Sequence, residues 1–366
     1  MRVSATSRIA YIHIGTHKTG TTSIQTLLAE NDGLLARAGI FVPRTARITP
    51  TSAGHHNLAW EINNPYQFDP NGGTRAALFE EIARADPTTV CISSEEFEFL
   101  CADPQKLSTL ADSFRAAGYE PHAIVYLRPQ ATYIESLYAE IVKRWTVEFR
   151  DFLNAILTHG IFGESCFDYD RLVGSAEAAF GIEQVHVRAY RANRSSNGLL
   201  REFLGIICGP GRHALDLGAV RWPERLNPML RCDELVAARL ALLGAGDVPA
   251  VDEIRRVVGG STAFAPLTLA EIRSVVQRFR RGNRQVARRH QLALGAASWS
   301  LVWRELRAIV TFDAAARARK RLARAIDLTA ADLRDHHAAS LSSGFHGAER
   351  HRLDGAESLL DDGAAL

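Results

Sequence analysis

Residues 9–23 read Ile-Ala-Tyr-Ile-His-Ile-Gly-Thr-His-Lys-Thr-Gly-Thr-Thr-Ser, and this stretch decides the fold. Its first six residues are mostly apolar and predict a short strand, and a helical pattern begins at Thr21. The loop between them contains two glycines, Gly15 and Gly20. Such a loop directs backbone N–H groups at one point, where the helix dipole adds about half a positive charge. The stretch therefore predicts a binding site for a phosphate or sulfate group.

The side chains of the loop support this prediction. Lys18 supplies a full positive charge, and Gly20 can adopt the positive φ that such loops often need. The residues expected to line the anion are Lys18, Thr19, Gly20, Thr21, Thr22 and Ser23. His17 is a further candidate for lining the loop, whereas His13, on the strand, is expected to be a satisfied core residue.

The spacing differs from the GxxxxGK[ST] loop that binds nucleoside triphosphates. In that loop the lysine directly follows the second glycine and reaches the β- and γ-phosphates, and the next hydroxyl contacts Mg²⁺. Here Lys18 lies two residues before Gly20, and Thr21 follows it. The sequence also has no apolar run that ends in a metal-holding aspartate. We therefore expect a ligand without a γ-phosphate that binds without a metal ion.

Outward from the loop, short apolar runs alternate with helical patterns as far as about residue 210. The runs predicted as strands are Ile9–Ile14, Ile40–Val42, Val90–Ser93, Ala123–Leu127 and Val185–Ala189. The stretches predicted as helices are Thr21–Ala38, Thr74–Ala85, Gln105–Ala117, Ala131–Arg144 and Glu148–His159. The alternation predicts an α/β fold with a mostly parallel sheet that is covered by helices.

A second element for binding an anion follows the fourth run. That run ends in Arg128 and Pro129, and a helix with Ser136 comes next. Arg128 is thus expected at the carboxyl edge of the sheet, where α/β proteins bind ligands. Ser136 follows eight residues later, roughly two helical turns. A guanidinium and a hydroxyl together would suit a terminal phosphate, although a surface arginine at the end of a strand is the alternative interpretation.

The motif GxxKxGTT at residues 15–22, followed by Arg128 and Ser136, resembles the PAPS-dependent sulfotransferases. PAPS is 3′-phosphoadenosine 5′-phosphosulfate. The resemblance covers roughly residues 9–210 and implies a P-loop NTPase-like fold, with PAPS as co-substrate and no metal. It implies that the loop binds the 5′-phosphosulfate, with Lys18 as a catalytic residue, and that Arg128 and Ser136 bind the 3′-phosphate. The C-terminal RKG-type motif of the cytosolic branch is not present.

The resemblance also implies a general base for the transfer of a sulfuryl group. The acceptor hydroxyl or amine must lose a proton as it attacks, and a positioned base contributes about 10²–10⁴-fold. In the carbohydrate-modifying branch this base is often a glutamate after a strand, which favours Glu95, with Glu96 as the alternative. His55 and His56, in a loop bordered by Gly, Ser and Pro, are rival bases or substrate contacts. The two glutamates could instead be ordinary first-turn acids of a helix.

The composition of the chain argues against two classes of protein, nucleic-acid binders and membrane-spanning proteins. The chain has 366 residues, with 43 Lys and Arg against 41 Asp and Glu. This balance argues against a dedicated nucleic-acid binder, and the absence of an apolar stretch of about 18 residues argues against a membrane span. The five cysteines are scattered without metal-ligand spacing and are expected to be free thiols in a reducing, cytoplasmic protein. We expect a small-molecule or glycan acceptor; the sequence does not determine the oligomeric state.

The C-terminal part reads as helical from about Arg225 onward. The predicted helices there are Asp233–Leu243, Leu269–Arg280, Asn283–Leu294 and Ala314–Ile326, and Gly205–Val220 reads as a loop. We divide the chain into a nucleotide-binding core at 1–225, a helical extension packed on it at 226–340 and a flexible tail at 341–366. Seven arginines between Arg273 and Arg289 would contact an anionic acceptor, close over the phosphates, or form a solvated face.

The resulting hypothesis is a PAPS-dependent sulfotransferase of the bacterial or carbohydrate type. Two other classes of protein fit parts of the sequence. One is a P-loop nucleoside kinase or nucleoside triphosphatase, which would need Mg²⁺. The other is a nucleotide- or glycan-binding module without catalytic activity.

Overall fold

The computed structural model describes residues 7–47, 53–142, 144–145, 147–190, 197–209, 211–223 and 267–292. The chain forms two compact units. The first consists of Met1–Leu137, Leu153–Pro228 and Leu267–Val302, and the second of Tyr138–Phe152, Met229–Pro266 and Trp303–Leu366.

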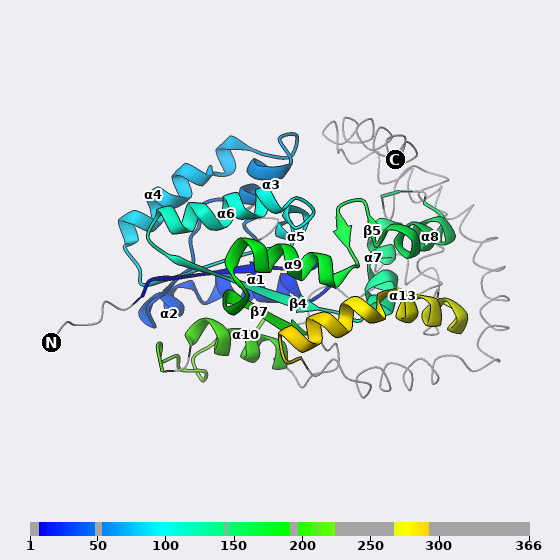
Figure 1. Ribbon diagram of the computed structural model, residues 1–366. Helices are drawn as coiled ribbons and strands as arrows, with labels where there is room; N and C mark the ends of the chain where they lie inside the picture. The colour runs from blue at the N-terminus through cyan, green and yellow to red at the C-terminus, as the bar shows by residue number, and fades with distance from the viewer. Residues whose placement is uncertain are drawn as a thin grey trace, which may run out of the picture. The chain divides into compact units, whose positions relative to one another are not determined.

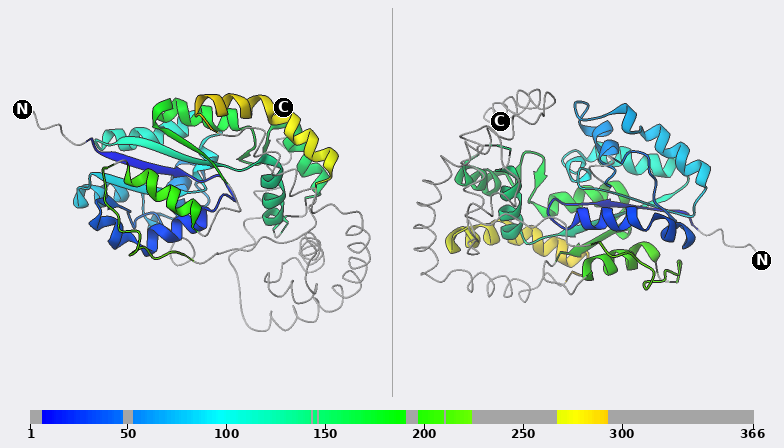
Figure 2. Two further views of the ribbon diagram at one scale, coloured as in Figure 1. Left: turned by 90° about the horizontal axis from the view of Figure 1, so that it is seen from below. Right: turned by 180° about the vertical axis from the view of Figure 1, so that it is seen from behind.

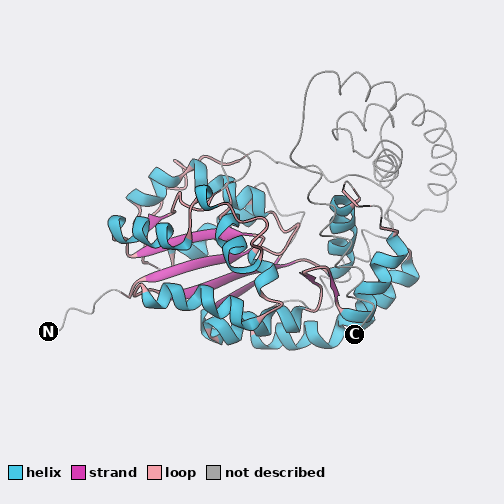
Figure 3. Ribbon diagram, turned by 90° about the horizontal axis from the view of Figure 1, so that it is seen from above, coloured by secondary structure: helices cyan, strands magenta, loops and turns pink. Residues whose placement is uncertain are grey.

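The first unit is built on a parallel sheet of five strands in the order β2-β3-β1-β4-β7 (Figure 3). The strands are β1 (Ile9–Ile14), β2 (Ile40–Phe41), β3 (Thr89–Ser94), β4 (Glu120–Leu127) and β7 (Val185–Ala189). The central strand β1 pairs with β3 and β4, so that Ile14 lies beside Ser94 on one side and Val125 on the other. The predicted fold class, an α/β fold with a helix-flanked parallel sheet, is confirmed.

Helices cover both faces of this sheet. In Figure 1, α4 (Arg75–Ala85) and α6 (Pro104–Ala116) lie above the strands and α10 (Gly198–Cys208) lies below them. The remaining helices before residue 190 are α1 (Thr21–Glu30), α2 (Asp32–Arg37), α3 (His56–Asn63), α5 (Phe97–Leu100), α7 (Gln130–Ile141), α8 (Phe149–His159) and α9 (Tyr169–Phe180). Short 3₁₀ turns at Pro70–Gly72 and Ile182–Gln184 and a small hairpin, β5 (Ile161–Phe162) with β6 (Ser165–Cys166), complete the set.

The strands are apolar because they are buried on both faces, as parallel strands usually are. Every residue of β3 is buried. On the α10 side, Tyr11 from β1 and Ile124 from β4 pack with Ile24 of α1 and Phe203 of α10. This core holds the start of α1 against the end of β1, and so fixes the loop between them.

Three local predictions need correction. The predicted helix at Thr21–Ala38 is broken at Asn31, whose Nδ2 donates to the carbonyls of Leu27 (2.8 Å) and Arg221 (2.9 Å). The predicted loop from Gly205 begins too early, because α10 continues to Cys208. The histidine pair predicted in a loop instead marks the start of α3, which begins at His56.

The predicted break near Arg280 in the C-terminal part is also wrong, because a single helix, α13, spans Leu269–Arg289. It begins at a capping box in which Thr268 and Glu271 bond each other's backbone N–H. It packs on α9, as Figure 2 shows in yellow and green. At Gly282 a Cβ would lie 3.1 Å from Asp170 Cβ, so glycine permits this close approach.

The other predicted C-terminal elements, Asp233–Leu243, Ala314–Ile326 and the tail at 341–366, lie outside the described residues. The division into a core at 1–225 and an extension at 226–340 therefore stays a prediction. Among the described residues, no helix is long and apolar enough to cross a membrane. The cysteines Cys91, Cys101, Cys166 and Cys208 are free thiols, and Cys232 is outside the described part.

The described part of the second unit is a small aromatic cluster. The hydroxyl of Tyr138 donates to the backbone carbonyl of Val147 at 3.0 Å. Its ring meets Phe149 edge-on at 4.9 Å between centroids, and Phe152 lies on the same ring at 5.4 Å. Edge-to-face contacts of this kind favour a defined packing of the rings.

Candidate functional site

The loop between β1 and α1 turns at two left-handed residues, Lys18 (φ 64°) and Gly20 (φ 83°). A Cβ at Gly20 would lie 2.6 Å from Leu199, and one at Gly15 would clash with Thr21, so both glycines are required. The helix starts with no side-chain cap and no acidic residue in its first turn. An uncapped helix start presents backbone N–H groups and the positive end of the dipole to an external anion.

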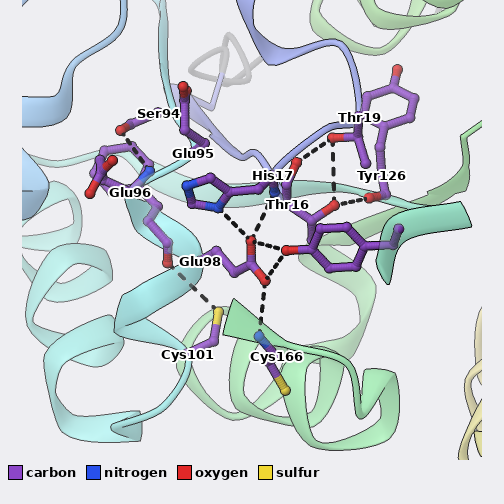
Figure 4. A network of polar contacts seen from close by, with 12 residues as sticks. Thr16, His17, Thr19, Ser94, Glu95, Glu96, Glu98, Cys101, Tyr126 and Cys166 are labelled. Carbon is purple, nitrogen blue, oxygen red and sulfur yellow. Dashed lines mark hydrogen bonds and ion pairs between the residues drawn. The ribbon is translucent and has the colours of Figure 1, made fainter. Parts of the chain in front are cut away.

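Two threonines brace the loop from inside. Thr16 Oγ1 donates to the carbonyl of Tyr126 at 2.7 Å, and Thr19 Oγ1 donates to the carbonyl of Thr16 at 2.6 Å (Figure 4). Both residues are fully buried. The Thr19 hydroxyl is therefore part of the loop's framework, so a contact between Thr19 and a bound anion would use its backbone N–H. Of the other predicted ligands, Thr21 is buried, whereas Lys18, Gly20, Thr22 and Ser23 are half-buried.

A buried carboxylate that the sequence analysis missed supports the loop from below. Glu98 is 0 % exposed and accepts from the backbone N–H (2.8 Å) and Nδ1 (2.9 Å) of His17. It also accepts from the hydroxyl of Tyr133 at 3.1 Å. A further donor is the backbone N–H of Cys166, also at 3.1 Å (Figure 4). Four donors offset the cost of burying this charge. The available signal was an acid inside an apolar run, Phe-Glu-Phe-Leu at 97–100.

The same network favours the charged form of His17. Burial by itself lowers the pKa of His17, but the hydrogen bond and charge of Glu98, with Glu95 and Glu96 nearby, outweigh it and raise the pKa. The imidazole stacks on Phe99 at 4.9 Å and remains 21 % exposed. His17 therefore adds an imidazole whose protonated form is favoured next to Lys18 on the loop.

The structure brings Arg128 to the loop. Its Nη1 donates to the backbone carbonyl of Lys18 at 2.8 Å, and its Nε donates to Thr132 Oγ1 at 3.1 Å. The guanidinium lies over the ring of Tyr190 at 5.7 Å. Burial lowers the pKa of Arg128, against the effect of tyrosines and Glu135 nearby, but an arginine stays protonated in proteins. The two predicted anion-binding elements thus meet at the carboxyl edge of the sheet.

Ser136 lies on α7 as predicted and is buried at 4 % exposure. Among the described residues, however, the Arg128 guanidinium bonds Thr132 rather than Ser136. The neighbouring Glu135 was not predicted to matter. It accepts the backbone N–H of Leu267, its buried Oε1 has no hydrogen-bond partner in the described part, and burial raises its pKa to about 7.

Glu95 follows β3 and lies beside the loop, with its Cα 3.3 Å from where a Cβ on Gly15 would be. Its carboxylate accepts from Gln25 Nε2 at 2.5 Å and lies 4.0 Å from His56 Nε2. Burial by itself would raise the pKa of Glu95, but His56, His17 and the bond from Gln25 lower it overall. The carboxylate is therefore ionised at neutral pH, and at 21 % exposure it is accessible from solvent.

The alternatives to Glu95 occupy different surroundings. Glu96 accepts from the indole N–H of Trp60 at 2.9 Å. His56 is buried, and its Nδ1 bonds Ser94 Oγ at 2.8 Å while Nε2 faces Glu95. His56 and Glu95 therefore form one group.

His55 is not placed to act as a base. Its Nδ1 accepts from the backbone N–H of Ser93 at 3.2 Å, and its Nε2 bonds the carbonyl of Pro43 at 3.0 Å. Burial lowers its pKa to about 3, so the ring is neutral. Both histidines of the pair are buried. His13 is buried as expected, but only its Nδ1 has a partner, Ser93 Oγ at 2.8 Å, within the described residues.

No group of three or more His, Cys, Asp or Glu side chains in the described ranges is arranged to hold a metal ion. No protein-family model matches the chain, and no curated protein matches it. Among solved structures, it is similar to the crystal structure of a sulfotransferase from Alicyclobacillus acidocaldarius. The two are 17 % identical with a TM-score of 0.37, over 73 % of this chain and 99 % of that one.

Proposed function

We propose that this protein is a sulfotransferase that transfers the sulfuryl group of PAPS to a hydroxyl or amine of a carbohydrate acceptor. The observation that carries this proposal is the 2.8 Å hydrogen bond from the Arg128 guanidinium to the carbonyl of Lys18. One strand–loop–helix site would suit many anions. A second cationic group beside it suits a ligand with two separate phosphate positions, one at the loop and one at the arginine.

The surroundings of the loop fit such a ligand. Lys18, His17 and Arg128 supply positive charge from the loop and from the end of β4, and the first turn of α1 carries no acid. Lys18 would lie against the oxygens that gain negative charge as the bond between sulfur and the phosphate oxygen breaks. When bound, PAPS supplies the activated sulfuryl group and the phosphate that leaves.

Glu95 is the base in this proposal. As the acceptor oxygen or nitrogen forms its bond to sulfur, its proton passes to the Glu95 carboxylate. Two properties support this role: the lowered pKa keeps the carboxylate ionised, and its partial exposure gives an acceptor access. Gln25 and His56 hold the carboxylate in place.

Binding is tested by calorimetric titration with adenosine 3′,5′-bisphosphate, the product of the reaction, in a buffer that contains a chelator. We expect binding by the natural protein and at least a tenfold loss in both Lys18→Ala and Arg128→Ala. The matched controls are Lys106→Ala, a lysine on α6 that bonds Asn63, and Arg84→Ala, an exposed arginine on α4. No binding without metal, together with Mg²⁺-dependent binding of ATP, would instead support a kinase or triphosphatase.

Transfer is tested with ³⁵S-labelled PAPS over a panel of carbohydrate acceptors. Glu95→Gln should bind the bisphosphate normally and lose at least 100-fold in transfer rate, because the amide cannot accept the proton. Full activity of Glu95→Gln would refute the assigned base. Binding of PAPS without transfer to any acceptor would favour a module that binds without catalysis.

A further inference from the structure

The outward face of α13 concentrates positive charge. The helix holds seven arginines and one acidic residue, whereas the whole chain has 43 basic and 41 acidic residues. Its inward side is formed by Ile272, Val275, Phe279 and Val286, which are buried. All seven arginines are exposed. The helix therefore uses an apolar side to pack and leaves its cations on the surface.

Four of these arginines form a row along the helix: Arg273, Arg280, Arg284 and Arg288. At 3.6 residues per turn they fall within an arc of about 80°, and at 1.5 Å per residue they span roughly 22 Å. Among the described residues, none of the four has an ion-pair partner. By contrast, Arg289 pairs with Asp170 and Glu177, each at 2.8 Å. We call Arg273, Arg280, Arg284 and Arg288 the arginine row.

A cavity of about 390 Å³ opens beside the row, between α13 and the start of α9. It is lined by Asp168, Asp170, Arg278, Phe279, Arg281, Gly282 and Gln285. Carboxylates accept hydrogen bonds from hydroxyl groups, and guanidinium and amide groups donate them. This mixture suits a neutral polyhydroxyl ring, and the volume lies in the usual range of small-ligand sites, about 300–1,000 Å³.

We propose that the cavity and the arginine row together bind an acidic oligosaccharide. One sugar ring occupies the cavity, with its hydroxyls on Asp168, Asp170 and Gln285. Carboxylates of neighbouring uronate residues lie on the arginine row, where guanidinium groups bind carboxylate in a bidentate manner.

The same surface does not suit the other common polyanions. Single-stranded nucleic acids need exposed aromatic side chains on which bases stack, and the aromatic residue of α13, Phe279, is 3 % exposed. Membrane-surface helices insert exposed apolar residues, whereas the apolar side of α13 is occupied by its packing on the first unit.

The site lies next to the turn that carries Arg128. Asp168 precedes Tyr169, whose hydroxyl donates to the backbone carbonyl of Arg128. Asn283 of α13 and Gln130 exchange two hydrogen bonds, at 2.8 and 3.0 Å, and both side chains are buried. An oligosaccharide on α13 is thus anchored beside the proposed site of transfer. Its role as the acceptor rests on the proposed function, whereas its binding does not.

The test is a calorimetric titration, at several salt concentrations, with a hexamer in which glucuronic acid alternates with neutral N-acetylglucosamine, so that a neutral ring is present beside each uronate. Arg280→Ala/Arg284→Ala should bind at least tenfold more weakly, and log K should fall less steeply with log salt, because two of the charges that attract the hexamer are lost. The control Arg37→Ala/Arg84→Ala removes the same charge from exposed positions on α2 and α4 and should bind within twofold of the natural protein. Arg280→Lys/Arg284→Lys should keep at least a third of the affinity. This variant distinguishes a loss of affinity caused by lost charge from one caused by disruption of α13.

Further ligands distinguish an acidic saccharide from a neutral saccharide, a nucleic acid and a membrane surface. The methyl ester of the hexamer keeps the rings without the charge and should bind at least tenfold more weakly. Gln285→Ala should weaken binding of the hexamer at least fivefold and leave binding of a six-residue oligothymidylate unchanged. The proposal is overturned by equal losses in the control, by no binding of the hexamer, or by tighter binding of the oligothymidylate or of phosphatidylglycerol vesicles.

A parallel titration of each variant with adenosine 3′,5′-bisphosphate separates the two proposals. The arginine-row variants should bind the bisphosphate as the natural protein does. If the natural protein binds the hexamer but not the bisphosphate, the proposed sulfuryl transfer fails and the saccharide site stands. If it binds only the bisphosphate, the saccharide site fails and the proposed function stands.

Discussion

Two acids are removed from water, Glu98 beneath the loop between β1 and α1 and Glu135 in the middle of α7, and they differ in their hydrogen-bond partners. Glu98 accepts from both His17 donors, from Tyr133 and from the backbone of Cys166. Glu135 accepts from the backbone of Leu267, and its Oε1 has no partner in the described residues. Burial raises the pKa of Glu135 to about 7, whereas the carboxylate of Glu98 has four protein donors in place of water, so the number of donors distinguishes the two acids.

The largest effect is expected for Glu98→Ala. Removing this carboxylate leaves the donors of His17, Tyr133 and Cys166 without their acceptor. We therefore expect a loss of about 3–5 kcal/mol in the free energy of unfolding. Urea unfolding measures this loss. Glu98→Gln, which keeps an acceptor oxygen, should lose less, and Glu96→Ala should lose under about 1 kcal/mol because its partner Trp60 is half-buried. A loss in the free energy of unfolding of less than about 1 kcal/mol in Glu98→Ala would show that the four donors of Glu98 do not distinguish it from Glu135.

Glu135→Gln tests whether Glu135 makes the free energy of unfolding depend on pH. The pKa of Glu135 in the folded protein, about 7, lies above its ordinary value, so the folded state holds a proton that the unfolded state releases. The stability of the natural protein therefore falls as pH rises from about 4.5 to 7, by up to about 3 kcal/mol from this group. Relative to the natural protein, Glu135→Gln should gain stability over that range, as urea unfolding at pH 5, 6, 7 and 8 would show. A difference in the free energy of unfolding between Glu135→Gln and the natural protein that is the same at every pH would contradict this prediction. The control is Glu80→Gln, at an exposed position.

Gly20→Ala tests how strongly the conformation of the loop between β1 and α1 is constrained. The φ of 83° is strained for alanine, and its Cβ would press on Leu199, so we expect a loss of about 1–3 kcal/mol. Binding of the bisphosphate should weaken in parallel. Gly33→Ala in α2, where the nearest atom to a Cβ is 3.8 Å away, should instead be neutral or gain about 0.4–1 kcal/mol. Similar results for both glycines would show that the loop is not constrained.

The smallest effect is expected for Tyr133→Phe. It removes one of the four donors of Glu98 and leaves three, so we expect a loss of about 0.5–1.5 kcal/mol in urea unfolding. It should also change the pKa of His17 by less than Glu98→Gln does, which NMR titration of the imidazole measures. A loss as large as that of Glu98→Ala would mean that the carboxylate depends on this single donor.

Several features could be predicted from sequence because their causes are local. The apolar run before Gly15 and the loop after it predict the strand, the turn and the helix start, and Arg128 at the end of a later run predicts its place at the same edge. The length of α13 could not be predicted, because Gly282 resembles a helix end until Asp170 packs against it. The break at Asn31 likewise depends on the carbonyl of Arg221, 190 residues away.

The order of most strands and helices along the chain, and the glycines, lysine and threonines of the loop between β1 and α1, can be read from the amino-acid sequence. Hydrophobic periodicity and backbone propensity act over a few residues, so their effects are visible there. The folded chain adds that Glu98 holds His17, that Arg128 reaches the carbonyl of Lys18, and that His55 is buried and neutral. Hydrogen bonds and burial join residues far apart in the chain, so the charge state and role of each side chain follow from its neighbours in space.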